Sequence, residues 1–193
     1  MKKLVQDFKL HVIKIANNNS FIHYSWFVKY HLEIVEKIAL ELCKKYPQAN
    51  KNLVLLLVWL HDYGKIVDFK NQHKATTTEG KRKLLKIGFA AEYVEKVIAY
   101  VNIIDSKINI TKAPLEVKIV SSADGASHFV GPFFSIFWKE NYTWKLTDLL
   151  KENKKKAKTD WDKKIVLPEV KEKFLNRHNH FLESYGEPPK KYL

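Results

Sequence analysis

Four residues combine metal-ligating chemistry with positions that predict burial. His61 and Asp62 directly follow the apolar run Leu53–Leu60, and Asp124 ends a second apolar run. A buried carboxylate is costly unless it pairs with a positive group or binds a metal. His31 lies on the apolar stripe of its own expected helix, so its imidazole also faces the core. Together these residues offer a mixed nitrogen and oxygen ligand set, which suits one divalent ion among Mn, Fe, Co, Ni, Zn and Mg.

Each of these residues also has a plainer interpretation when it is taken alone. A single histidine on an apolar helix face is usually a hydrogen-bonded core residue, which applies to His31. Asp62 alone can cap the end of a helix or pair with a lysine. The combination, in this order and in these surroundings, is more specific than any one member.

The elements that must bring these residues together are expected to be helices, because apolar residues recur at three- and four-residue steps over most of the chain. Helices are expected over about 5–16, 25–46, 53–60, 74–86, 90–103, 114–124, 146–164 and 168–185. The helix over 53–60 is apolar on every side, which is typical of a central, buried helix. Gly64 is well placed to end it, and residues 66–72 are expected to form a loop. The chain is therefore predicted to be all-α.

Composition sets the broad class of protein. The chain has 193 residues, 46% of them hydrophobic, with six Gly and six Pro, which predicts one globular domain over residues 1–193. Its longest apolar run is far shorter than the roughly 20 residues of a membrane span. Charged residues interrupt the N-terminal segment before it can serve as a signal peptide, and Cys43 is the only cysteine, so we expect a cytoplasmic protein with no membrane partner.

The formal net charge of +13 favours anionic partners such as nucleotides or nucleic acid. The same charge is also expected of any protein from a lysine-rich proteome, because charge patterning alone is a weak pointer. The net charge therefore does not indicate which class of anion the protein binds.

The four residues resemble the H…HD…D signature of the HD-domain superfamily of metal-dependent phosphohydrolases. The likeness is carried by His31, by the segment Leu60–Lys65 and by Asp124, and it covers about residues 25–128. The resemblance implies an HD-type helical bundle with a five-helix core, followed by extra C-terminal helices over about 145–185. It assigns the metal ligands to His31, His61, Asp62 and Asp124.

Two departures from the family pattern narrow the expectation. Dinuclear branches use extra histidines between the HD pair and the last aspartate, whereas this sequence offers only His73 there. One metal is therefore expected rather than two, which counts against the oxygenase chemistry of dinuclear iron relatives. The nucleotidase branch often has a glutamate three residues after the HD aspartate, where this chain has Lys65.

The resemblance implies hydrolysis of a small phosphorylated metabolite, and a nucleotide is the expected substrate. The cation would activate a water, with Asp62 among the residues that hold it. Lys65 is expected to reach a substrate phosphate as a point charge, unless it is a solvated surface lysine. Glu79 is a candidate general acid or base, although we favour it as a helix cap. His73 is a candidate phosphate-binding or proton-transfer group, with an exposed loop histidine as the alternative.

A lysine-rich segment follows the signature region. Residues 151–164 contain seven lysines against three acids, with Trp161 among them. Lys158 of this segment and Arg82 could form a rim that receives anions, with Trp161 stacking on a base. We favour a solvated helix face with Trp161 turned into the core, and packing for the aromatic residues over 129–144. The alternative function is a non-catalytic nucleotide or nucleic-acid binding module on the same scaffold, with nucleic acid not favoured.

Overall fold

The computed structural model describes residues 1–185 and 191 of the chain. Within these residues the regular structure is entirely helical, which confirms the all-α prediction. The elements in chain order are α1 (Lys2–Ala16), the π-helical turn η1 (Val28–Leu32), α2 (Glu33–Lys45), α3 (Lys51–Leu60), α4 (Tyr63–Val67), the 3-10 turn η2 (Phe69–Asn71), α5 (Gln72–Ile87), α6 (Ala91–Ser106), the 3-10 turn η3 (Ile110–Lys112), α7 (Leu115–Ser127), α8 (Phe133–Glu140), α9 (Leu146–Thr159), the π-helical turn η4 (Asp160–Lys164) and α10 (Pro168–Tyr185). The predicted single domain also takes in residues 186–190 and 192–193, which lie outside the described residues.

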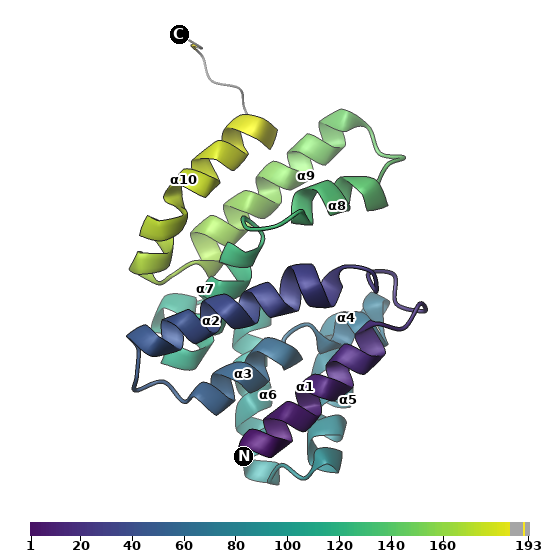
Figure 1. Ribbon diagram of the computed structural model, residues 1–193, viewed down its shortest axis with the longest axis vertical. Coiled ribbons are helices and arrows are strands. Elements are labelled where there is room, and N and C mark those ends of the chain that lie inside the picture. Colours follow the sequence, from purple (N-terminus) through teal and green to yellow (C-terminus); the bar gives the residue numbers. More distant parts are fainter. Residues whose placement is uncertain (186–190, 192–193) are drawn as a thin grey trace.

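Helices α2 and α7 lie in the middle of the molecule (Figure 1). Helices α1 and α3–α6 gather at one end, while α8, α9 and α10 gather at the other. Helix α7 contacts α2, α3 and α6 as well as η4 and α10. It therefore joins the N-terminal helices to the C-terminal ones, and the buried apolar residues form one cluster from Val5 to Phe181.

Helix α3 is the buried centre that its apolar sequence predicts. Its side chains from Val54 to Leu60 are almost all inaccessible to solvent, with Leu55 only partly buried. The Asn50 side chain caps its start by accepting a hydrogen bond from the Leu53 backbone N–H, at 3.1 Å. The buried helix thus delivers His61 and Asp62 into the interior at its C-terminal end.

The structure corrects the prediction for the segment after α3. The helix ends at Leu60, and Gly64 lies inside the next helix, α4, instead of ending α3. Residues 66–72 are largely helical, since α4 is followed at once by η2 and α5. Gly64 is needed because α4 packs closely on α5, where an added Cβ would collide with the Gln72 carbonyl oxygen. The glycine therefore serves helix packing and not helix termination.

Two predicted helices contain a π-helical turn that periodicity did not indicate. The helix expected over 25–46 begins with η1, which carries His31, and the helix expected over 146–164 ends with η4, which carries Asp160 and Lys164. Single π-helical turns are frequent at functional sites because they shift the direction of side chains along a helix. In the described part of the chain, every helix is too short or too polar to cross a membrane.

Candidate metal centre

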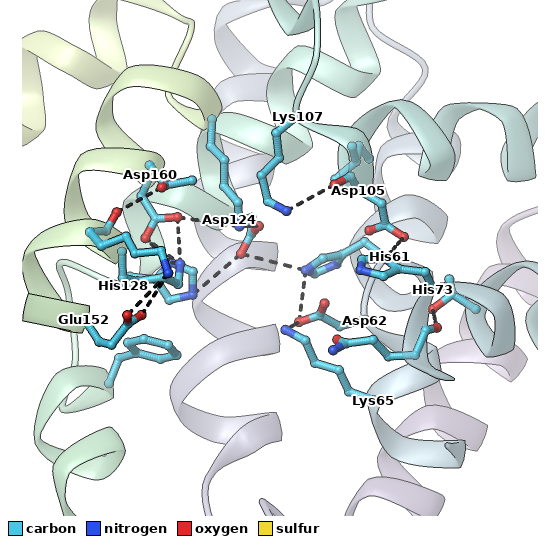
Figure 2. A pocket seen from close by; sticks show the side chains of 18 residues that line it. His61, Asp62, Lys65, His73, Asp105, Lys107, Asp124, His128, Glu152 and Asp160 are labelled. Carbon is cyan, nitrogen blue, oxygen red and sulfur yellow. Dashed lines mark hydrogen bonds and ion pairs between the residues drawn. The ribbon is translucent and has the colours of Figure 1, made fainter. Parts of the chain in front are cut away.

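The four signature residues come from separate elements and meet in the interior. His31 comes from η1, His61 and Asp62 from the junction of α3 and α4, and Asp124 from α7. All four are buried. In Figure 2, Asp124 lies in the centre, with His61 and Asp62 on one side of it and His128 on the other. The structure thus brings together all the residues that the sequence singles out as metal ligands.

The Nε2 atoms of His31 and His61 each lie within 4 Å of one oxygen of Asp62 and one oxygen of Asp124. The His31 Nε2 atom lies 3.1 Å from Asp62 Oδ2 and 3.7 Å from Asp124 Oδ1. The His61 Nε2 atom lies 3.5 Å from the same Asp62 oxygen and 3.8 Å from the same Asp124 oxygen. His31, His61 and Asp62 form one group that could hold a metal, and Asp124 adjoins this group through both histidines.

The hydrogen bonds of the imidazoles leave the His61 Nε2 atom without a partner, whereas His31 Nε2 lies at hydrogen-bond distance, 3.1 Å, from Asp62 Oδ2. His61 donates from Nδ1 to the Val58 carbonyl oxygen at 2.8 Å, so its Nε2 carries a lone pair, and this buried atom has no hydrogen-bond partner. Ser127 donates its hydroxyl proton to the Asp124 carbonyl at 2.7 Å, and its oxygen lies 3.3 Å from His31 Nδ1. A hydrogen bond at the ring nitrogen that does not face the ion is what fixes the tautomer of metal-binding histidines. The donor set therefore fits a divalent cation.

Lysines balance the charge of the two carboxylates. Lys65 lies 2.7 Å from Asp62 Oδ2, and Lys164 lies 2.5 Å from Asp124 Oδ2. Burial acts to raise the pKa of Asp62, but Lys65 and the histidines outweigh it and hold that pKa well below the usual range. Burial also acts to raise the pKa of Asp124, but Lys164 and the histidines outweigh it, so this pKa too stays well below its usual range. Both carboxylates are therefore ionised and ready to ligate at neutral pH.

A second buried cluster adjoins the first. His128 Nε2 lies 3.8 Å from Asp124 Oδ1, and its ring stacks on that of His31 with centroids 5.2 Å apart. Its Nδ1 atom lies 3.0 Å from Asp160, which is fully buried and contacts Lys156 at 2.6 Å. Burial and the nearby Lys156 lower the pKa of His128 to about 3, so the imidazole is neutral at physiological pH. His31, Asp124 and His128 form a second group that could hold a metal.

From the sequence we did not select His128, Asp160 or Lys164 as site residues. One signal was available, since His128 is four residues after Asp124 and Lys164 is four residues after Asp160, which places each pair on one helix face. The sequence holds no sign that the two faces meet, because about 30 residues separate them.

A cavity of about 340 Å³ opens beside the metal ligands and is lined by His61, Asp62 and Asp124 together with lysines. The lysines are Lys65, Lys107, Lys155, Lys156 and Lys164. They come from α4, the end of α6, α9 and η4, as Figure 2 shows for Lys65 and Lys107. We call this space the metal cavity. Its wall offers these lysines to an anionic ligand, although Lys65, Lys155, Lys156 and Lys164 each pair with a carboxylate that also lines the cavity.

The other predicted site residues differ in their placement. His73 lines the metal cavity at the start of α5 and pairs with Asp105 at 3.2 Å. Glu79 lies in the middle of α5 and pairs with Arg82, so our preference for a helix cap is wrong, and neither residue lines the cavity. Lys158 is 79% exposed and lies 3.5 Å from Asp162. It does not line the metal cavity, and it lies on roughly the opposite side of α9 from Lys156, two residues before it, because successive positions on a helix diverge by about 100°.

The aromatic residues after α7 only partly follow the prediction of packing. Trp161 packs against the core and stacks on His178 with centroids 4.1 Å apart, as we favoured. Phe129 is buried, but Tyr142 and Trp144 are exposed, so the prediction is wrong for these two.

A family model described as HD domain matches residues 28–127, just over half of the chain. The matched segment includes His31, His61, Asp62 and Asp124. No curated protein and no solved structure matches the chain.

Proposed function

We propose that this chain, which belongs to the HD domain family, is a metal-dependent phosphohydrolase. Its proposed substrate is a small phosphorylated metabolite, namely a nucleotide. HD domains are generally metal-dependent hydrolases. The observation that carries the proposal for this chain is the buried, unpartnered His61 Nε2, which faces the two ionised carboxylates. A divalent cation bound here would accept the free lone pair of His61 and would be neutralised by the carboxylates.

His31, His61, Asp62 and Asp124 would hold one divalent ion, and Asp62 thereby takes part in catalysis. When bound, such an ion supplies Lewis-acid chemistry and lowers the pKa of a water molecule, which provides a nucleophile at neutral pH. The protein supplies the geometry, since each ligand side chain is buried and fixed by its own hydrogen bonds.

The two lysines beside the carboxylates have different roles in this proposal. Lys164 contacts Asp124 through Oδ2, whereas the histidines face Oδ1, so Lys164 can stay in place and orient that carboxylate. Lys65 contacts the same Asp62 oxygen that the histidines face, and its side chain is partly exposed to the metal cavity. We assign Lys65 to the substrate phosphate, which it reaches once Asp62 is engaged elsewhere.

The far wall of the metal cavity completes the phosphate site. Lys155 and Lys156 project from α9, and Lys107 projects from the end of α6, where its residue adopts a left-handed backbone conformation with φ of 55°. Burial lowers the pKa of Lys156 to about 8, so the ammonium still carries its charge at neutral pH. Charge on the phosphoryl oxygens is thus opposed by lysines from two sides. His73, which also lines the metal cavity, stays a candidate phosphate-binding residue.

A screen of nucleotides and sugar phosphates, with Mn, Co, Ni and Mg tested separately, tests the proposal. We expect phosphate release from a subset of nucleotides with at least one of these ions and none in the presence of a chelator. Absence of turnover with every ion and every ester contradicts the proposal.

A further inference from the structure

A second cavity, of about 160 Å³, adjoins the metal cavity and is lined mainly by aromatic side chains. We call it the aromatic pocket and define it by Trp26, Phe27, Phe69, Phe133 and Phe137. The two cavities share Lys65 and Gln72 as lining residues, and they also share His128 and Phe133. Any molecule held at Lys65 therefore has direct access to the aromatic pocket.

The walls of the aromatic pocket are fixed in position. The Trp26 indole N–H donates to Glu140 Oε1 at 2.8 Å, and His23 contacts the same oxygen at 2.9 Å. The Phe133 ring stands edge-on to Trp26, with centroids 6.0 Å apart, and lies 4.2 Å from the ring of His128. Because these contacts already hold the rings in place, a ligand would not have to order them on binding.

Phe69, in the short turn η2, lines the aromatic pocket and is 45% exposed, although its ring stands edge-on to His23 with centroids 5.4 Å apart. Phe27, which also lines the pocket, is buried. Gln72 is a further lining residue, and its amide can both donate and accept hydrogen bonds. A flat ring with polar substituents would cover Phe69 and meet Gln72 at its edge.

The size of the pocket limits what can enter. An apolar cavity of about 150 Å³ accepts a benzene molecule, so a volume of about 160 Å³ matches a single six-membered ring. A fused two-ring purine is larger than benzene and would fit a space of this volume less closely. Aromatic walls favour planar rings over saturated groups because flat faces stack and make edge-to-face contacts.

We infer that the aromatic pocket binds the organic part of the substrate, and that this part carries a single planar six-membered ring. The inference rests on the proposed function, because it places the phosphate of the same molecule against Lys65 in the metal cavity. A pyrimidine nucleotide and a simple aryl phosphate both present such a ring. The pocket thus selects among phosphate esters by ring size and planarity.

The test compares kcat/KM for four esters: uridine 5′-monophosphate, phenyl phosphate, guanosine 5′-monophosphate and ribose 5-phosphate. We expect at least one single-ring ester to exceed both ribose 5-phosphate and the purine ester by about tenfold or more, consistent with the usual contribution of aromatic stacking. Preference for the uridine ester identifies a pyrimidine nucleotide, and preference for phenyl phosphate identifies an aryl ester. Equal turnover of ribose 5-phosphate, or faster turnover of the purine ester, overturns the inference.

Variants assign the selectivity to the pocket. Phe69→Ala and Phe137→Ala are expected to reduce the ratio of kcat/KM between the preferred single-ring ester and ribose 5-phosphate by about tenfold. Tyr142→Ala is the matched control, because Tyr142 is 82% exposed and lies outside the pocket lining. It should leave the ratio unchanged. A ratio that stays the same in both pocket variants overturns the assignment.

A binding experiment separates failure of this inference from failure of the proposed function. Ligand-observed NMR of uridine, phenol and ribose, recorded on the metal-free protein, reports ring binding without any turnover. We expect uridine or phenol to bind the wild type and to lose binding in Phe137→Ala, while ribose binds neither. If no ester is hydrolysed but the ring still binds, only the proposed function fails, and if no ring binds, the inference fails.

Discussion

The buried polar residues of this protein form a charge-balanced set. Asp62 pairs with Lys65, and Asp124 pairs with Lys164, which also lies 3.6 Å from Asp160. Removing one member of a buried ion pair leaves an uncompensated charge and is strongly destabilising. Single substitutions can therefore distinguish two kinds of residue. Loss of a metal ligand should lower the metal content, and loss of a lysine that pairs with a ligand should lower the free energy of unfolding.

The first residue-scale prediction concerns His61. His61→Ala removes the one imidazole whose ligating nitrogen has no other partner, so we expect metal content to fall from one ion per chain to a small fraction of that value. Elemental analysis after dialysis measures it, and circular dichroism should show that most helicity is retained. His180→Ala, on the exposed face of α10, is the matched control and should keep its metal. Full metal content in His61→Ala would refute its role.

The second residue-scale prediction concerns Lys164. Lys164→Met keeps the length of the side chain but leaves the buried Asp124 and Asp160 without their shared ammonium, so the free energy of unfolding should fall by about 3–5 kcal/mol. Urea unfolding of the metal-free protein measures this loss. The exposed neighbour provides the control Lys163→Met, which should change stability by less than about 0.5 kcal/mol. Equal stability of the two variants contradicts the account.

The third residue-scale prediction concerns pH. Burial and Lys156 lower the pKa of His128 in the folded protein to about 3, against an ordinary value of 6.5. Below pH 6.5 the unfolded chain binds a proton that the folded chain does not, so the free energy of unfolding should decrease as the pH falls from 6.5 towards 3. His128→Asn should make this decrease shallower in chelator-treated protein. A wild-type slope that the substitution leaves unchanged shows that His128 is not its source.

At the scale of elements, the sequence is most informative where one helix is apolar on every side. Periodicity predicts α3 and places His61 and Asp62 at its end, because burial of such a helix is its only stable arrangement. It does not predict α4 and η2, since residues 63–71 contain too few turns to show a period. It also does not predict the π-helical turns that orient His31 and Asp160, because an inserted residue leaves no mark on composition.

The element-scale prediction concerns Gly64. A Cβ at this position would lie 2.6 Å from Thr76 Oγ1 and closer still to the Gln72 backbone carbonyl, so α4 would have to move away from α5. Gly64→Ala should therefore lower the free energy of unfolding by about 3 kcal/mol and weaken metal binding at the adjacent Asp62. Gly131→Ala is the control, since its nearest contact is an ordinary 3.4 Å, and it should cost less than about 0.5 kcal/mol. Wild-type stability of Gly64→Ala would contradict the packing argument.

At the scale of the whole molecule, the C-terminal helices belong to the site. Lys156, Asp160 and Lys164 reach the metal cavity from α9 and η4, some 30 to 40 residues after Asp124. The sequence shows a lysine-rich helix there but not which of its lysines point inwards, because several buried positions of this segment, such as Asn153 and Asp160, are themselves polar. Lys158 was the wrong choice from this segment, as it points into solvent.

The whole-molecule prediction concerns the net charge of +13. If charge alone defined the function, the protein would bind single-stranded nucleic acid tightly without metal. We expect only non-specific binding, with a Kd of about 10⁻⁴ to 10⁻⁶ M at physiological salt and a steep loss of affinity as salt rises. Fluorescence anisotropy in the presence of a chelator measures it. Tight, metal-independent binding at physiological salt would favour the binding-module alternative instead.

The most direct test of the central claim is a crystal structure of the wild-type protein grown with Mn²⁺, with the ion located by its anomalous signal. We predict one ion per chain, within about 2.0–2.3 Å of His31 Nε2, His61 Nε2 and a carboxylate oxygen of each of Asp62 and Asp124. A second ion at His31, Asp124 and His128 would point to a dinuclear centre. No ion among the four residues at saturating Mn²⁺, or an ion bound only at the surface, would contradict the account.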